Sequence, residues 1–306
     1  MNEHAVVFDC GTDPLLGILH APPECGDTGL VIIVAGGPQY RVGAHRQFVV
    51  LSRQLAKQGI PVLRFDHRGT GDSGGNYRGF MDMSDDIHAA IDTLCERFPD
   101  IKQIMLWGEC ESATAAAFYA QTDPRVSGIF MVNPWIRTEA GQAKTYLKHY
   151  YWNRLRDPKF WQKIRSGEFS LLRSVKDWFS LLSRARKDSA DSAKALQEND
   201  MTALPLPERL TRSLQQFPGK IYILTSGFDY IAQEFNDFIA SSPLWKKSGL
   251  DERITFSEMT DADHTFSRPE WRRQLFGETE NWLIGEKVAQ TRPEDIQDTA
   301  RQGLQG

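Results

Sequence analysis

The stretch IKQIMLWGECESATAAA, residues 101–117, constrains the fold of this chain more than any other feature. Its apolar run at 104–107 is short enough for a buried strand, and the small residues from 112 onward suit a tightly packed helix. Between them lies Gly108-Glu109-Cys110-Glu111-Ser112. A strand, a sharp turn and a helix with a nucleophile at the turn are typical of the G-x-S-x-G nucleophile elbow. Here Cys110 replaces the serine and Ser112 replaces the second glycine.

The turn contains two candidate nucleophiles, Cys110 and Ser112. Small residues are needed two positions either side of the nucleophile, because the strand and the helix approach closely there. Gly108 and Ser112 meet that need around Cys110. With Ser112 as the nucleophile, Cys110 and Thr114 would occupy these two positions, and they fit less well. A helix N-terminus favours negative charge and hence a thiolate, although Glu109 and Glu111 oppose it if they point toward the sulfur. Cys110 is therefore the favoured nucleophile, and the alternative interpretation is a buried structural cysteine.

Apolar runs and amphipathic segments alternate along most of the chain. Short apolar runs predict strands at 5–8, 15–20, 30–35, 61–65, 104–107, 126–133, 220–226 and 253–257. Helical spacing of apolar residues follows several of them, for example over 46–58 and 87–95. The alternation predicts an α/β protein with a mostly parallel central sheet and helices on both faces. The active site of such a sheet lies at the carboxyl ends of its strands.

The alternation stops between residues 136 and 217. This segment has a helical pattern, is rich in aromatic residues and is basic. Between Arg137 and Lys187 the chain contains thirteen Lys or Arg and only four Asp or Glu, whereas the whole chain has a net charge of -4. We interpret 136–217 as a helical cap inserted into a core formed by 1–135 and 218–287, with a polar tail at 288–306. Its charge could attract an anionic or carrier-linked substrate or an acidic membrane surface, and a solvated face is an equally good interpretation.

Three residues suited to nucleophilic catalysis each follow a predicted strand. Cys110, Asp229 and His264 occur in the order nucleophile, acid, histidine that is typical of the α/β-hydrolase fold. In this hypothesis His264 takes the thiol proton or holds the thiolate in an ion pair, and Asp229 fixes the imidazole tautomer. Asp261 and Asp263 are alternative acids, but they lie so close to His264 in sequence that reaching its far nitrogen is awkward.

An oxyanion hole would complete the site. Its donors in this fold are the N–H after the nucleophile and an N–H in the loop after an early strand. These are the N–H groups of Glu111 and Gly37, with Gln39 as a substitute because the residue between Gly37 and Gln39 is a proline. Asn133 stands at the alternative acid position of the fold and, as an amide, leaves Asp229 the better candidate.

Composition and motifs argue against several other classes of protein. A net charge of -4 gives no reason to expect nucleic-acid binding, and no apolar run approaches the roughly 18 residues of a membrane span. The start of the chain has no signal-peptide pattern. Four cysteines without C-x-x-C spacing argue against a structural zinc site. We therefore expect a cytoplasmic protein without a metal or other cofactor, and the sequence leaves its oligomeric state open.

Over nearly its whole length the chain resembles the α/β-hydrolases. GGPQYRVGAHRQF at 36–48, RFDHRGTGDSGG at 64–75, the cysteine elbow and YLKHYYWNRL at 146–155 resemble the exosortase A system-associated hydrolases (type 1). Those are bacterial proteins found with exopolysaccharide and protein-sorting loci. The resemblance implies a class of chemistry and a bacterial cytosolic setting, without a particular substrate. The candidate substrate-binding residues are His45, Trp152, Arg154 and Arg156.

The favoured function is a cysteine-dependent hydrolase that cleaves an ester or thioester of a small molecule through an acyl-enzyme on Cys110. An acyltransferase with the same triad is the first alternative, because polyester synthases, which resemble this layout, use a cysteine elbow and a coenzyme A donor. A hydrolase-like binding protein without turnover is the second alternative, and it predicts an unreactive Cys110.

Overall fold

The computed structural model of the 306-residue chain describes residues 2–34, 40–137 and 201–285. Its contacts divide the chain into two compact units, Met1–Trp135 with Leu210–Gly306, and Ile136–Arg209. Most of the predicted cap and the whole predicted tail lie outside the described residues, so both stay predictions. The first unit contains the sheet and the nucleophile, acid and histidine of the candidate site.

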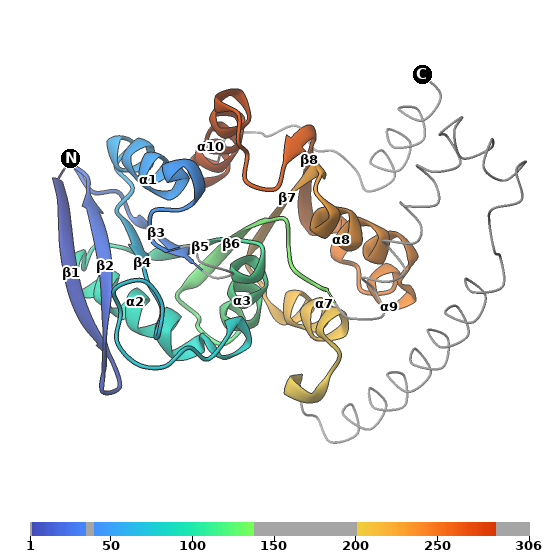
Figure 1. Ribbon diagram of the computed structural model, residues 1–306, viewed down its shortest axis with the longest axis horizontal. Helices are drawn as coiled ribbons and strands as arrows, with labels where there is room; N and C mark the ends of the chain where they lie inside the picture. The colour runs from blue at the N-terminus through green and yellow to red at the C-terminus, as the bar shows by residue number, and fades with distance from the viewer. Residues whose placement is uncertain (1, 35–39, 138–200, 286–306) are drawn as a thin grey trace, which may run out of the picture. The chain divides into compact units, whose positions relative to one another are not determined.

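An eight-stranded sheet forms the centre of the first unit (Figure 1). Its strands are β1 (Asn2–Cys10), β2 (Asp13–Ala21), β3 (Thr28–Ile33), β4 (Val62–Phe65), β5 (Gln103–Glu109), β6 (Val126–Val132), β7 (Lys220–Phe228) and β8 (Ile254–Asp263). They lie in the order β1-β2-β4-β3-β5-β6-β7-β8. The β1–β2 and β2–β4 pairs are antiparallel and the other five pairs are parallel. The prediction of a mostly parallel sheet is confirmed.

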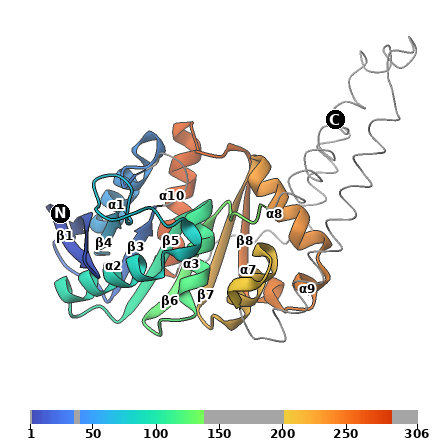
Figure 2. The same ribbon diagram turned by 60° about the horizontal axis from the view of Figure 1, so that its bottom comes forward.

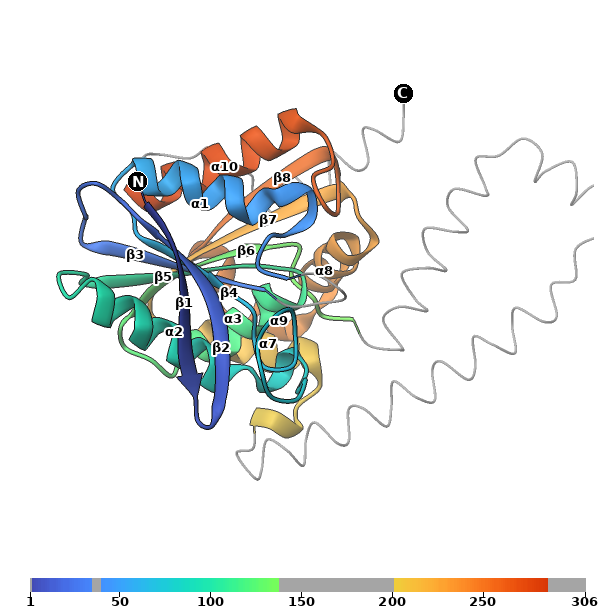
Figure 3. The same cartoon turned by 60° about the vertical axis from the view of Figure 1, so that its left-hand side comes forward.

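Helices cover both faces of this sheet, as the sequence predicted. In Figure 3, α1 (Gln47–Lys57) and α10 (Pro269–Ile284) lie on one face, and α2 (Ser84–Arg97) and α3 (Glu111–Ala120) lie on the other. The described residues also form α7 (Leu206–Gln216), α8 (Tyr230–Ser241), α9 (Pro243–Lys246) and the short 3-10 turns η1 (Ala44–Arg46), η2 (Phe80–Asp82), η3 (Met201–Ala203) and η4 (Leu250–Glu252). The apolar spacing of 46–58 explains α1, because Phe48, Leu51 and Leu55 are all buried against the sheet.

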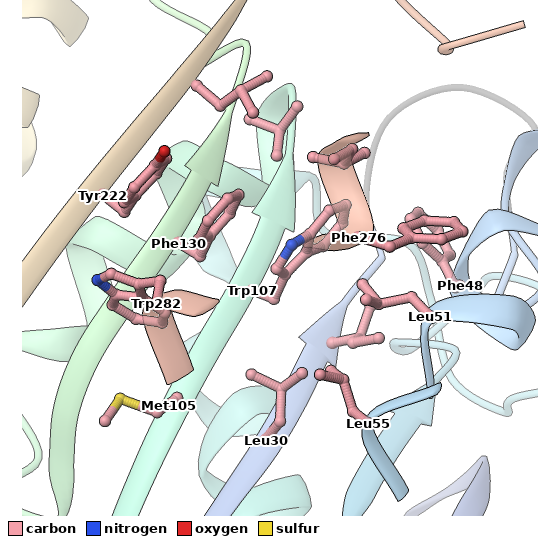
Figure 4. Packing of buried hydrophobic residues seen from close by; sticks show 14 of the residues in the cluster. Leu30, Phe48, Leu51, Leu55, Met105, Trp107, Phe130, Tyr222, Phe276 and Trp282 are labelled. Carbon is pink, nitrogen blue, oxygen red and sulfur yellow. The ribbon is translucent and has the colours of Figure 1, made fainter. Parts of the chain in front are cut away.

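Aromatic side chains fill the core between the sheet and the α1 and α10 helices (Figure 4). Trp107, Phe130 and Tyr222 occupy matching positions on β5, β6 and β7. The Phe130 and Tyr222 rings stack with their centroids 4.5 Å apart, and Trp282 of α10 packs edge-on against Phe130. Such pairs contribute about 0.5–1.5 kcal/mol each beyond the apolar area they bury. This layer fixes the register of the strands that lead to the candidate site.

The two last strands are longer than the sequence predicted. The run at 253–257 belongs to β8, which continues to the residue directly before His264. Its later residues are polar because β8 is an edge strand, so part of it faces solvent and needs no continuous apolar sequence. β7 and β8 lie side by side (Figure 2). Cys110, Asp229 and His264 each follow the last residue of a strand, namely β5, β7 and β8.

Candidate active site

The turn between β5 and α3 holds Cys110 in an unusual backbone conformation. Cys110 has φ 61° and ψ -123°, and it is the N-cap of α3. A Cβ on Gly108 would lie 2.5 Å from the backbone carbonyl carbon of Ser112, so the close approach of strand and helix excludes any larger residue at Gly108. The predicted order of strand, sharp turn and helix is therefore present, with a partly exposed thiol at the turn.

Ser112 is held inside the turn. It is 1% exposed, and its Oγ donates to the Glu109 carbonyl and accepts from the Glu109 N–H, both at 2.8 Å. A hydroxyl that closes the turn in this way has no free path to a substrate. The geometry therefore favours Cys110 over Ser112 as the reactive side chain.

Asp229 and His264 are brought together from two neighbouring strand ends. His264 Nδ1 donates to Asp229 Oδ2 at 2.7 Å, and the imidazole also interacts with the Cys110 side chain. Asp229 is buried and caps α8, where its carboxylate accepts from the N–H groups of Ile231 and Ala232 at 3.0 and 3.3 Å. The helix cap fixes the carboxylate, and the carboxylate in turn orients the imidazole.

The surroundings of His264 favour its protonated form. Burial opposes the positive charge, but hydrogen bonds with Asp229 and Cys110, with the charges of Asp229 and Glu109, outweigh burial and raise the pKa of His264 to about 11. A histidine that keeps its proton through neutral pH is a suitable partner for a thiolate.

The alternative acid Asp263 and the amide Asn133 at the alternative acid position make hydrogen bonds elsewhere, and the other alternative acid, Asp261, is exposed. The Asp263 carboxylate accepts from the backbone N–H groups of Thr265 and Ser267 at 3.2 and 2.9 Å and from the Ser267 hydroxyl. The Asn133 side chain accepts from the Ser226 N–H at 2.8 Å and donates to the Ser226 hydroxyl at 3.0 Å. Both groups therefore brace the strand ends, which leaves Asp229 as the acid in contact with His264.

Glu109 and Gln47 are two buried residues of the site that the sequence did not identify. Glu109 is 3% exposed, and its Oε2 accepts from Gln47 Nε2 of α1 at 2.5 Å. Burial raises the pKa of Glu109 to about 7, although the nearby His264 and the Gln47 hydrogen bond act in the opposite direction. The sequence places Glu109 beside the nucleophile, but no local pattern shows that its side chain is buried.

The loop after β4 is tied to the segment that follows β3. The buried Asp66 carboxylate accepts from the Arg41 N–H at 2.7 Å and forms an ion pair with the Arg41 guanidinium, which also binds Asp72 at 2.6 Å. His45, a candidate substrate-binding residue, has φ 51°, and its Nε2 lies 3.5 Å from Thr265 Oγ1, next to His264 in sequence. This placement puts His45 at the rim of the site.

Other candidates fall where the structure gives no description. They are Gly37 and Gln39 of the predicted oxyanion hole, and Trp152, Arg154 and Arg156 of the predicted cap. Glu111, the third oxyanion candidate, is the first residue of α3, and the helix has no intrahelical acceptor for an N–H at this position. Among the described residues, no three His, Cys, Asp or Glu side chains are grouped to hold a metal ion. None of the described helices combines the length and the apolarity that a membrane span requires.

Comparisons with known proteins agree with this architecture. The family model described as serine aminopeptidase, S33, matches residues 28–200, more than half of the chain. No curated protein matches the sequence. An esterase from Pyrococcus furiosus is 17% identical with a TM-score of 0.61, over 94% of this chain and 92% of its own. A thermostable carboxyl esterase from Bacillus coagulans is 14% identical with a TM-score of 0.59, over 94% of this chain and 100% of its own.

A third similar structure is an α/β serine hydrolase without a lid from Xanthomonas campestris. It is 14% identical with a TM-score of 0.53, over 93% of this chain and 94% of its own. At such low identities the likeness shows the fold alone. The predicted α/β-hydrolase fold is confirmed.

Proposed function

Because the chain belongs to the hydrolase family described as serine aminopeptidase, S33, we propose that it cleaves an ester or thioester through an acyl-enzyme on Cys110. The 2.7 Å hydrogen bond from His264 to Asp229, on an imidazole that also interacts with the Cys110 side chain, is the observation that carries this proposal. The family description names a serine enzyme, so the thiol is a departure of this chain from its family. It changes the nucleophile and leaves the base and the acid in their expected order.

In the first half of the reaction, His264 Nε2 already holds the proton of the Cys110 thiol in an ion pair, and the sulfur bonds to the carbonyl carbon of the substrate. The carbonyl electron pair moves to the oxygen, which the Glu111 N–H stabilises together with the N–H of Gly37 or Gln39. When the carbonyl re-forms, the bond to the leaving group breaks. His264 gives its proton to the departing oxygen or sulfur.

In the second half, water attacks the acyl group on Cys110 and gives a proton to His264. The second tetrahedral intermediate collapses, the carbon–sulfur bond breaks, and the acid leaves, which restores the ion pair of Cys110 and protonated His264. Asp229 stays ionised throughout and holds the imidazole in one tautomer. The charge-assisted contact of Asp229 with His264 therefore supports proton transfer in both halves of the reaction.

We also propose that the substrate is a small anionic or carrier-linked acyl compound. The thirteen Lys or Arg between Arg137 and Lys187 are the feature that supports it, with Trp152, Arg154 and Arg156 as candidate contacts and His45 at the rim. The same triad would serve an acyltransferase if an alcohol or thiol replaced water. The resemblance to exosortase-associated hydrolases supports a bacterial cytoplasmic setting.

The decisive test combines mutation with detection of the acyl-enzyme. Cys110→Ala and His264→Ala should each abolish turnover of a p-nitrophenyl ester and of a thioester, and intact-mass measurement should show acyl transfer to the wild type and none to Cys110→Ala. Cys25→Ala, which removes an exposed thiol, is the matched control and should keep full activity. Normal turnover by Cys110→Ala would rule out the mechanism. Adding an excess of alcohol and analysing products would separate hydrolysis from acyl transfer.

A further inference from the structure

We propose that Glu109 is a positioning residue of the catalytic centre, a second carboxylate that acts with Asp229 to keep His264 protonated. This inference rests on the proposed triad and goes beyond it, because the triad mechanism uses one carboxylate. It also assigns a role to the residue directly before the nucleophile.

The Glu109 side chain points into the protein on the side of the sheet that α1 covers. Side chains two positions apart on a strand share a face, and Trp107 packs against Phe48 of α1 with ring centroids 5.5 Å apart. Glu109 therefore points to the α1 face, as its hydrogen bond from Gln47 Nε2 shows. The carboxylate lies above the aromatic core and inside the protein.

A structural role explains the Glu109 carboxylate poorly. Within the described residues, Glu109 Oε2 has one donor and the buried Oε1 makes no hydrogen bond. A buried carboxylate with so few donors destabilises a fold strongly, whereas glutamine would fill the same space at lower cost. The charge therefore needs a compensating partner, and within the described part of the chain the His264 imidazolium is a positive group that interacts with it.

The Glu109 carboxylate is one of several ionisable groups that interact with His264. Glu109 interacts with His264 and with Asp229, and His264 interacts with both carboxylates and with the Cys110 thiol. Burial raises the pKa of Glu109 to about 7, so its negative charge appears as the pH rises through neutrality. Above that pH the imidazolium interacts with two negative carboxylates, and below that pH it interacts with one. The ionisation of Glu109 therefore strengthens the hold of His264 on its proton.

The test is an NMR titration of the His264 imidazole in the full-length protein. In the wild type we expect a step near pH 7, where Glu109 ionises, and loss of the imidazolium proton only at high pH. In Glu109→Gln, whose amide oxygen can still accept from Gln47, the step should disappear and the imidazolium should lose its proton about one pH unit lower. A Glu109→Gln titration identical to the wild type would overturn the proposal.

Two further variants serve as a control and as a second test. Glu258→Gln is the matched control, because burial alone raises the pKa of this half-buried carboxyl on β8, and its titration should equal that of the wild type. Gln47→Met removes the donor that stabilises ionised Glu109, so the step should move to higher pH. If the step stays in place in Gln47→Met, the proposal fails, whether or not Glu109→Gln folds.

The same titrations separate the two proposals. If wild-type His264 titrates near the ordinary value of about 6.5 and does not respond to Cys110→Ala or Asp229→Asn, the triad itself is wrong. If His264 titrates high and responds to both of those changes but not to Glu109→Gln, the triad stands and only the role of Glu109 is refuted.

Discussion

Cys110 has a backbone conformation that residues other than glycine rarely adopt. Such a residue costs about 1–3 kcal/mol and persists where the surrounding structure holds it in place. Here β5 holds one side of the turn, α3 holds the other, and Ser112 closes the turn from within. Cys110 is partly exposed at this turn, and its side chain interacts with the imidazole of His264.

Asp229 combines two roles that one substitution can separate. Asparagine caps helices about as well as aspartate, so Asp229→Asn should keep the N-terminus of α8 intact and leave the melting temperature nearly unchanged. It removes the charge that stabilises the His264 imidazolium, and an amide can favour the wrong tautomer. We expect turnover of a p-nitrophenyl ester to fall roughly 10⁴-fold with little change in KM.

Asp261→Asn is the control for that measurement. Asp261 is exposed and lies three residues before His264, so its charge should not matter for turnover. If Asp261→Asn lost as much activity as Asp229→Asn, the assignment of the acid would be wrong.

At the scale of the elements, the elbow depends on how closely β5 and α3 approach. Gly108→Ala would place a methyl group 2.5 Å from the Ser112 carbonyl group, which is backbone and has little room to move. We expect this variant to lower the free energy of unfolding by about 1–3 kcal/mol and to reduce activity, because the turn must open. Thermal and guanidinium unfolding measure the first effect, and the p-nitrophenyl ester assay measures the second.

Gly277→Ala provides the opposite case on α10. Among the described residues, the methyl group of an alanine at this position would meet no atom within 4 Å apart from its own helix backbone and chain neighbours. Alanine is the better helix former by about 0.5–1 kcal/mol, so this variant should be neutral or stabilising. Equal behaviour of the two alanine variants would mean that close approach at Gly108 does not limit the turn.

Local sequence patterns predicted most helices and strands, and missed the features that depend on contacts with residues far away along the chain. The elbow follows from seventeen consecutive residues, so the sequence could predict it. The extent of β8 depends on pairing with β7 alone at the sheet edge, and its polar residues concealed it. Buried Glu109 interacts with Gln47 and His264, which lie far away along the chain. Sequence order could therefore propose the triad, while the second carboxylate required the assembled sheet.

The whole molecule brings the candidate site together through sheet topology. Parallel strands place their carboxyl ends at one edge, and β5, β7 and β8 each deliver one residue there. Asp229 and His264 are 35 residues apart in sequence, and their hydrogen-bonded atoms lie 2.7 Å apart in the fold. The same assembly encloses Glu109, so the site and the stability of the fold are linked.

That link predicts how Glu109 changes the stability of the molecule with pH. The pKa of Glu109 is about 7 in the folded chain, compared with an ordinary value of 4.5. As the pH rises from 4.5 to 7, the unfolded chain releases this proton and the folded chain keeps it, so the free energy of unfolding decreases through that window. Glutamine has no proton to release. Glu109→Gln should therefore stabilise the protein by on the order of 1–3 kcal/mol at about pH 8 and by little at about pH 4.5.

Guanidinium unfolding of the wild type and Glu109→Gln at those two pH values measures the difference. An equal gain at both would indicate better packing rather than charge, and a loss at the higher pH would show that the ionised carboxylate stabilises the fold. A gain confined to high pH, together with a weaker hold of His264 on its proton, would mean that the chain keeps a destabilising buried charge for its effect on the imidazole. Natural proteins show this trade-off between stability and activity at sites where function needs a strained or charged group.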